Sequence, residues 1–224
     1  MNIINLARDN PLYPPNLMKV PGYYVPDNIE AIGGLRILES PKIALFCSIK
    51  CPGEMILKAY DLAHALCATG ASVVSGFHSP MEKEVLNVLF RSRNPAIICP
   101  ARSIEGMRQP KEYQRPIEEG CLLLLSPFEK KIKRATVQTT IVRNRFAAAL
   151  ADRILIAHAS EDGKMEAFCR EILEWGKPVF TLESDYNKRL IAMGVKKFSQ
   201  EILKFQDFNR QEMNRGGTET RRFL

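Results

Sequence analysis

The sequence has no apolar run that is long enough to cross a membrane. A transmembrane helix needs about 18 or more consecutive apolar residues, and the best candidate here is the short run Cys121–Leu125. The first residues, MNIINLARDN, also lack the apolar core of a secretory signal peptide. We therefore expect a soluble, cytoplasmic protein with no membrane partner.

Metal-binding and disulfide patterns are missing as well. Cys47 and Cys51 stand four apart, and no second cysteine or histidine pair follows to complete a zinc site. The other four cysteines lie in apolar runs that are typical of reduced core thiols, namely Cys67, Cys99, Cys121 and Cys169. Without a secretion signal, disulfides are not expected. The sequence thus predicts neither a metal site nor a bound cofactor.

Neither a Walker A motif nor the GxGxxG fingerprint of dinucleotide-binding proteins occurs in the chain. What the chain does have is an ordinary globular composition, with 46% hydrophobic and 25% charged residues. Its 224 residues suit one well-buried α/β domain with short extensions. The net charge of +7 is compatible with a polyanionic partner.

Short apolar runs alternate with segments of helical periodicity over most of the chain. The expected strands cover residues 42–47, 71–75, 95–99, 121–125, 153–157 and 178–182. The expected helices cover residues 53–69, 80–91, 111–119, 139–150 and 164–175. Such strands, apolar throughout and separated by helices, predict an α/β fold: a doubly wound, mostly parallel Rossmann-like sheet with helices on both faces. Ligands of such sheets bind beyond the carboxyl ends of the strands.

The two ends of the chain differ from this central part. Residues 1–40 are rich in proline, which disfavours regular helix, and predict an arm packed on the domain, with Ile29–Leu38 as a short helix or strand that turns at Gly33-Gly34. Residues 41–205 form the expected Rossmann-like domain, in which residues 187–205 add a short helix and a final strand or helix. Residues 206–224 are polar and without periodicity, which predicts a disordered tail.

Two strand-end loops offer small polar residues to an anion. Ser48 and Lys50 follow the first strand and precede a helix N-terminus, where free backbone N–H groups attract phosphate. After the second strand, Gly76 beside Ser75 would allow a ligand to approach the backbone closely. Read alone, the first loop is more simply an ordinary strand-to-helix turn, and the nearby His78 is most simply a surface residue.

The stretch from residue 128 to residue 145 is strongly basic. It holds a single acid, Glu129, and six cations: Lys130, Lys131, Lys133, Arg134, Arg143 and Arg145. Phosphate backbones attract such clusters and release counterions on binding. Arg143 and Arg145 lie in an apolar helix, where a guanidinium needs a partner such as phosphate. The alternative is that one arginine ties the helix to a carboxylate and that the lysines are merely solvated.

A fourth loop, Ala159–Lys164, follows the strand at residues 153–157. Gly163 and Lys164 open the next helix and extend the candidate anion site. Glu161 and Asp162 are most simply capping residues that complement the helix dipole. Their alternative role is a carboxylate pair that faces a sugar or a nucleophilic water.

Several short pieces occur in the order and spacing of a known family. They are YPPNL at residues 13–17, IALFCS at 43–48, VVSG at 73–76, RNRFAAALADRILI at 143–156, GKPVF at 176–180 and LIAMG at 190–194. Together they resemble the DNA-processing protein A (DprA/Smf) family over roughly residues 10–200. The chain departs from that pattern at Cys47, Ile49 and His158, where the family has glycine, arginine and an acidic residue. We expect a short, divergent member without the C-terminal winged helix.

The resemblance implies a non-catalytic protein that binds single-stranded DNA on an extended Rossmann fold, usually as a homodimer, and delivers it to a RecA recombinase. Carried over by position, it places Ser48, Ser75, Gly76, Arg143, Asn144 and Arg145 around a pocket beyond the strand ends. Phe77 or Phe128 could stack on bases, although aromatic residues in such loops more often plug the core.

Two other functions remain open at this point. The first is nucleotide binding or sensing of the kind found in the lonely-guy-like superfamily, which shares this sheet. Its sequence support is Gly163 with Glu166, and hydrolysis is not expected because the rest of the enzyme motif is missing. The second is a scaffold that kept the fold and lost its ligand.

Overall fold

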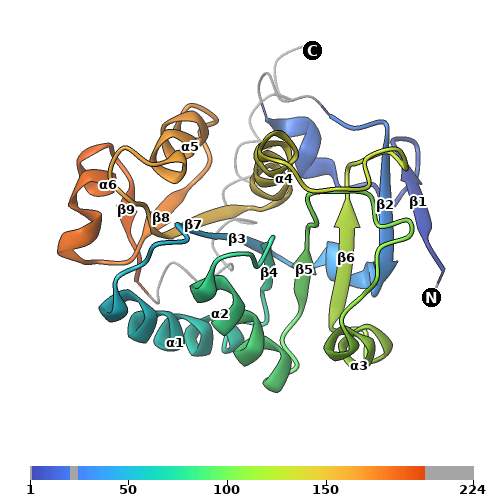
Figure 1. The fold of residues 1–224 in the computed structure, drawn as a ribbon, viewed down its shortest axis with the longest axis horizontal. Helices are drawn as coiled ribbons and strands as arrows, with labels where there is room; N and C mark the ends of the chain where they lie inside the picture. Colours follow the sequence, from blue (N-terminus) through green and yellow to red (C-terminus); the bar gives the residue numbers. More distant parts are fainter. Residues whose placement is uncertain (1, 21–24, 200–224) are drawn as a thin grey trace, which may run out of the picture.

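The computed structural model describes residues 2–20 and 25–199, and in this part of the chain nine strands form one sheet (Figure 1). The strands are β1 (Ile4–Ala7), β2 (Asn28–Gly33), β3 (Lys42–Cys47), β4 (Ser72–Ser75), β5 (Ala96–Ile98), β6 (Leu122–Ser126), β7 (Arg153–His158), β8 (Val179–Thr181) and β9 (Lys196–Lys197). The α-helices are α1 (Gly53–Cys67), α2 (Pro80–Arg91), α3 (Gln114–Glu118), α4 (Val137–Leu150), α5 (Lys164–Leu173) and α6 (Lys188–Ala192). Short 3-10 helices are η1 (Pro15–Lys19), η2 (Leu35–Glu39), η3 (Lys111–Tyr113) and η4 (Asp185–Asn187).

The sheet has the order β1-β2-β6-β5-β4-β3-β7-β8-β9. From β6 to β9 all neighbouring strands are parallel, whereas β2 is antiparallel to both β1 and β6. The chain lays down β3 to β6 in one direction and then returns through α4 to place β7 on the other side of β3. The switch point between β3 and β7 confirms the predicted doubly wound α/β fold.

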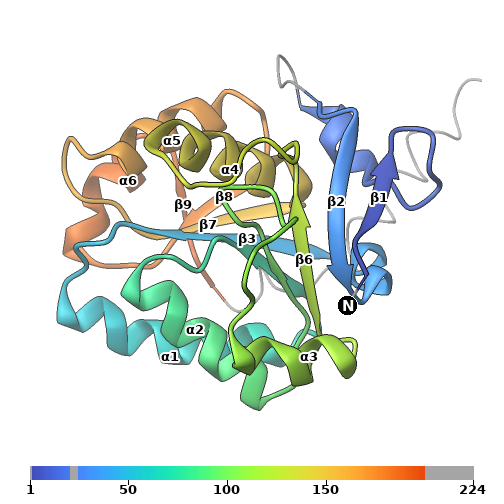
Figure 2. The ribbon, with the colours of Figure 1, turned by 45° about the vertical axis from the view of Figure 1, so that its right-hand side comes forward.

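Helices cover both faces of the sheet (Figure 2), with α1, α2 and α3 on one face and α4 and α5 on the other. Successive residues of β3 face opposite ways, so that Leu45 packs with α1 and α2 while Phe46 packs with α4 and α5. The Phe46 ring meets Phe168 of α5 edge to face at 5.2 Å. Burial on both faces is the reason that the strands are apolar throughout.

The proline-rich N-terminal segment contributes to the same sheet through β1 and β2. The predicted turn at Gly33 is present: Gly33 has a φ of +117°, and a Cβ there would lie only 2.2 Å from the carbonyl oxygen of Leu122. Glu30 of β2 is buried and accepts hydrogen bonds from the Ser103 hydroxyl and from the Ile104 N–H, at 2.8 and 2.7 Å. In η1, Leu17 is fully buried in the core that also contains α4. A domain boundary at residue 40 stays a prediction.

Some helix bounds differ from expectation. The helix expected at residues 111–119 divides into η3 and α3, because Pro116 has no N–H to donate and its ring excludes the carbonyl four residues before it. Conversely, α4 begins at Val137, where Thr136 and Thr139 form a capping box. Residues 200–205 and the predicted tail lie outside the described residues. Within the described part, no helix is long and apolar enough to span a membrane.

Candidate nucleic-acid interface

The loops that the sequence singles out all open at one edge of the sheet. They follow β3, β4, β6 and β7, and these strands run parallel, so that their carboxyl ends point the same way. The loops are nevertheless spread along the edge, because β5 and β4 separate β6 from β3. The candidate residues therefore line an extended edge as well as a local pocket.

Ser48 joins the loops on the two sides of the switch point. Its N–H donates to the carbonyl oxygen of His158 at 2.9 Å, and its hydroxyl accepts from the N–H of Ser160 at 2.9 Å. The Ser160 hydroxyl in turn donates to the Lys50 carbonyl at 3.2 Å. The hydroxyl of Ser48 thus holds the β7–α5 loop, while the side chain of Lys50 is exposed to solvent.

Beside this junction lies a cleft of about 620 Å³ that contains residues which the sequence did not reveal. Its lining comprises Lys50, Cys51, Pro52, His158, Ala159, Ser160, Glu161, Glu166, Asp185, Tyr186, Arg189 and Leu190. Tyr186 and Arg189 come from η4 and α6, in the segment after β8 that leads into the LIAMG motif at residues 190–194. Their position just after a parallel strand and next to that motif is a signal that could have nominated them.

Ser75 and Gly76 lie at the end of β4 and are enclosed by the fold. Ser75 is fully buried, and its hydroxyl accepts a hydrogen bond from the Phe77 N–H at 3.1 Å. At Gly76, an added Cβ would lie 1.0 Å from Nη1 of Arg143. Gly76 therefore makes room for an arginine of the same chain. Phe77 is buried in the core and has a φ of +48°.

Arg143 reaches from α4 to the carboxyl ends of β4 and β5. The side chain is 6% exposed, and its Nη1 donates to the Cys99 carbonyl at 3.3 Å. Its Nε is buried without a hydrogen-bond partner among the described residues. Burial lowers the pKa of Arg143, and the nearby Glu82 carboxylate opposes that change. Arg143 is thus a buried positive charge that lies beneath the loops at the carboxyl ends of β4 and β5.

Glu82 is the carboxylate that balances this charge. It belongs to the capping box of α2 and accepts hydrogen bonds from the N–H groups of Cys47 and His78, at 2.9 and 2.7 Å. Burial raises the pKa of Glu82, whereas these hydrogen bonds and the charge of Arg143 favour its ionised form. One acid therefore ties together the loops after β3 and β4 and the N-terminus of α2.

The other two members of the Arg-Asn-Arg triplet have different surroundings. Arg145 forms a bidentate ion pair with Glu171 of α5, at 2.7 and 2.9 Å, which is the helix-to-carboxylate tie that the sequence left open. Asn144 is partly exposed, and its side chain forms no hydrogen bond with any other described residue. Asn144 is therefore the member of the triplet whose polar groups are available to a ligand.

The basic loop before α4 divides into paired and unpaired cations. Lys130 pairs with Glu105 at 2.9 Å, and Lys131 pairs with Glu129 at 2.8 Å. Each carboxylate raises the pKa of its lysine through a hydrogen bond and charge. The last two cations of the loop, Lys133 and Arg134, are exposed and have no ion pair with another described residue. They are the cations that an external anion can reach without displacing a carboxylate.

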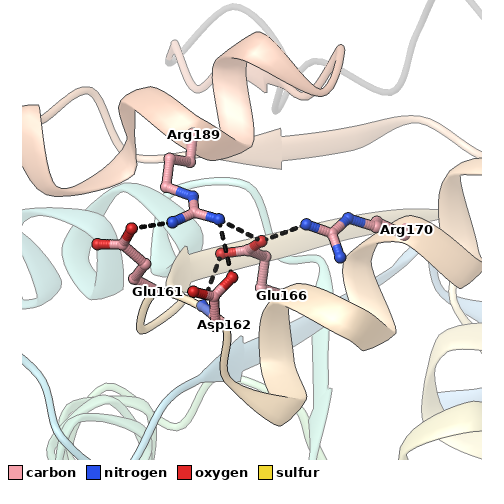
Figure 3. Close-up of polar contacts among 5 residues, drawn as sticks. All are labelled: Glu161, Asp162, Glu166, Arg170 and Arg189. Carbon is pink, nitrogen blue, oxygen red and sulfur yellow. Dashed lines mark hydrogen bonds and ion pairs between the residues drawn. The ribbon is translucent and has the colours of Figure 1, made fainter.

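The N-terminus of α5 is surrounded by acidic side chains (Figure 3). Arg189 contacts the carboxylates of Glu161, Asp162 and Glu166, the last two at 3.0 and 3.3 Å. Glu166 is 2% exposed and also accepts from Arg170 at 2.5 Å. Gly163 is the N-cap of α5 and the neighbouring Lys164 is exposed, so these two candidates lie beside this ion-pair cluster.

The family of the chain follows from a comparison of its sequence with family models. The match is to DNA recombination-mediator protein A and extends over residues 5–204. The chain belongs to this family. The resemblance that rested on short motifs is thereby confirmed. A comparison with curated protein sequences gave no match.

Solved structures with the same fold include DNA processing protein A from two bacteria. The protein from Streptococcus pneumoniae is 19% identical, with a TM-score of 0.76 over 93% of this chain and 75% of that one. The protein from Helicobacter pylori, for which a single-stranded DNA binding mode is described, is 21% identical, with a TM-score of 0.71 over 96% of this chain and 97% of that one. A molybdenum cofactor carrier protein from Chlamydomonas reinhardtii is more distant, at 12% identity and a TM-score of 0.50 over 77% and 99% of the two chains. At these identities the likeness concerns the fold alone.

Proposed function

We propose that this family member binds single-stranded DNA through phosphate contacts along the carboxyl-end edge of its sheet and catalyses no reaction. Membership of the DNA recombination-mediator protein A family supports a role in DNA processing or recombination. The single-stranded DNA binding mode of the Helicobacter pylori protein supports the choice of ligand. A homodimer and a recombinase partner belong to the same proposal.

The observation that carries the proposal is the set of exposed cations without carboxylate partners at this edge. They are Lys133 and Arg134 after β6, Lys50 after β3 and Lys164 at the start of α5, none of which forms an ion pair with another described residue. The strands β6 and β7 are four inter-strand spacings apart, or about 19 Å at ~4.8 Å each. That span suits a polynucleotide better than a single nucleotide, and it favours DNA over the nucleotide-sensing alternative.

The acidic residues near the cleft support a binding role over hydrolysis. A general base must have its carboxylate free to take a proton from water. Glu161 and Glu166 are instead engaged by Arg189, and Glu166 also by Arg170. Either carboxylate would have to leave an arginine before it could act on a substrate.

The proposal is tested by removing the two unpaired cations of the basic loop. In the variant Lys133→Ala/Arg134→Ala, affinity for a single-stranded oligonucleotide should fall, because two phosphate contacts are lost. The slope of log affinity against log salt should become shallower by about 1.4, at ~0.7 per phosphate on a single strand. Fluorescence anisotropy between about 50 and 200 mM salt measures both quantities.

A charge-matched control is available at the opposite edge of the sheet. Arg36 of η2 and Arg91 at the end of α2 are both exposed and precede the amino ends of β3 and β5. Replacing both by alanine changes the net charge equally and should leave the salt slope as in the wild type. Wild-type binding that is absent, or that does not vary with salt, would contradict the proposed function.

A further inference from the structure

The cleft beside the switch point differs in chemistry from the basic loops along the rest of the edge. Its volume of about 620 Å³ lies within the usual range for small-ligand sites, about 300–1,000 Å³. Two of its polar side chains, His158 and Glu166, are themselves more than nine-tenths buried, with 6% and 2% exposed. The cleft therefore contains two polar side chains that the fold holds in place.

The charges of the cleft disfavour a phosphate inside it. Its lining has three carboxylates, those of Glu161, Glu166 and Asp185, and two cations, Lys50 and Arg189. The guanidinium of Arg189 already contacts three carboxylates (Figure 3). A phosphate that bound Arg189 would have to displace those carboxylates and would face their repulsion, which leaves the exposed Lys50 as the lining cation that can hold a phosphate. A neutral group that donates hydrogen bonds fits this lining better.

His158 presents a hydrogen-bond acceptor to such a group. The amide nitrogen of Asn187 donates to the carbonyl oxygens of Ala157 and Leu182, at 2.8 and 3.0 Å, which fixes Oδ1 of Asn187 as an acceptor. Nδ1 of His158 lies 3.1 Å from that Oδ1 and must therefore carry a proton. With the proton on Nδ1, Nε2 is the nitrogen of the neutral ring that can accept a hydrogen bond, and His158 is one of the residues that line the cleft.

Tyr186 provides an aromatic surface at the same place. It is 54% exposed, lines the cleft, and meets the His158 ring edge to face with centroids 6.4 Å apart. An exposed ring of this kind is a stacking platform for a nucleobase. The aromatic ring and the acceptor thus lie next to each other in the lining of the cleft.

We propose that this cleft is a nucleobase subsite of the DNA-binding edge. A base stacks on Tyr186, and its exocyclic amino group donates a hydrogen bond to Nε2 of His158. This favours cytosine, adenine or guanine over thymine, which has no exocyclic amino group. The inference rests on the proposed function, because the phosphates on either side of the base are held by the exposed cations of the edge.

Oligonucleotides of equal length test the stacking step: an oligo(dC), an oligo(dT) and an oligomer of abasic sites. Wild-type protein should bind the oligo(dC) most tightly. Tyr186→Ala should weaken oligo(dC) binding by about fivefold to a hundredfold and leave the abasic oligomer unaffected, because only base stacking is removed. Tyr186→Phe, which keeps the ring, should bind like the wild type.

The role of His158 as a hydrogen-bond acceptor is tested by comparing the affinities for oligo(dC) and oligo(dT). His158→Leu should remove the preference for oligo(dC) over oligo(dT). If that buried substitution unfolds the protein, wild-type protein with an oligomer of N4,N4-dimethylcytosine gives the same comparison, since this base cannot donate from its exocyclic nitrogen. Retention of full oligo(dC)-like affinity for the dimethylated oligomer would overturn the assignment of His158.

The abasic oligomer separates the two proposals. If wild-type protein binds the oligo(dC) and the abasic oligomer equally, and both in a salt-dependent way, the base subsite is wrong and phosphate binding stands. If neither oligomer binds in a salt-dependent way, the proposed function itself fails. Equal weakening of both oligomers by Tyr186→Ala would also overturn the base subsite.

Discussion

At the scale of single residues, Gly76 and Arg143 depend on each other. The sequence pattern nominates both as ligand contacts, yet the guanidinium of Arg143 occupies the place where a side chain at residue 76 would begin. Arg143 in turn is balanced by Glu82, which binds the backbone of the loops after β3 and β4. These residues set the shape of the carboxyl-end edge from beneath, so their contribution to DNA binding would be through the loops that they position.

The close contact between Gly76 and Arg143 predicts that adding one methyl group at residue 76 destabilises the protein. Gly76→Ala should lower the free energy of unfolding by about 1–3 kcal/mol, because the added Cβ overpacks a buried site and displaces the guanidinium. Gly53→Ala is the matched control, since a Cβ there meets nothing within 4 Å. Urea denaturation of both variants measures the difference, and equal stabilities would show that Arg143 moves aside without cost.

At the scale of elements, α4 connects most of the site. The basic loop leads into its N-terminus, Arg143 reaches from its middle to β4 and β5, and Arg145 ties it to α5. Its apolar side, with Phe146 and the alanines after it, packs on the sheet beside η1. A single helix therefore sets where the basic loop and the N-terminus of α5 lie relative to each other.

The tie between α4 and α5 can be measured by a double-mutant cycle. We expect Arg145→Ala and Glu171→Ala to show a coupling energy of about 0.5–1 kcal/mol, near the upper end for partly exposed pairs because the contact is bidentate. The exposed pair Arg115–Glu119 within α3 should couple less strongly, since it is a local contact within one short helix. A coupling near zero for Arg145–Glu171 would mean that this ion pair does not help to hold the two helices together.

At the scale of the whole molecule, the N-terminal segment is continuous with the sheet and the core. β1 and β2 extend the sheet beyond β6, and η1 buries Leu17 in the core cluster that contains α4. A segment bonded in this way should unfold together with the rest of the described chain. The site on α4 would then depend on residues far from it in the sequence.

Truncation of one buried side chain tests whether the N-terminal segment unfolds together with the rest of the described chain. Leu17→Ala should lower the free energy of unfolding by about 2–5 kcal/mol in a single cooperative transition. Met18→Ala, at the neighbouring position that is 59% exposed, should have little effect. Two separate transitions in calorimetry, of which Leu17→Ala affects only the first, would instead indicate an arm that unfolds independently.

The order of strands and helices between residues 42 and 182 could be predicted from residue patterns alone, whereas β1 in the proline-rich segment was not predicted. Apolar runs such as Lys42–Cys47 and Arg153–His158 are too continuous for a half-exposed strand, and the helices between them require parallel pairing. The same rules place the candidate loops at one edge of the sheet. The short ordered motifs were sufficient to identify the family, because their spacing reflects that topology.

The partners of the charged residues were decided only by the tertiary structure. Arg145 meets Glu171 across 26 positions, Arg143 meets Gly76 across 67, and Arg189 of α6 contacts Glu166 of α5 across 23. A local pattern records the periodicity of burial, which depends on neighbours along the chain. Which guanidinium finds a carboxylate, and which cation stays free for a phosphate, depends on how distant elements pack, and that is fixed only when the sheet and its helices come together.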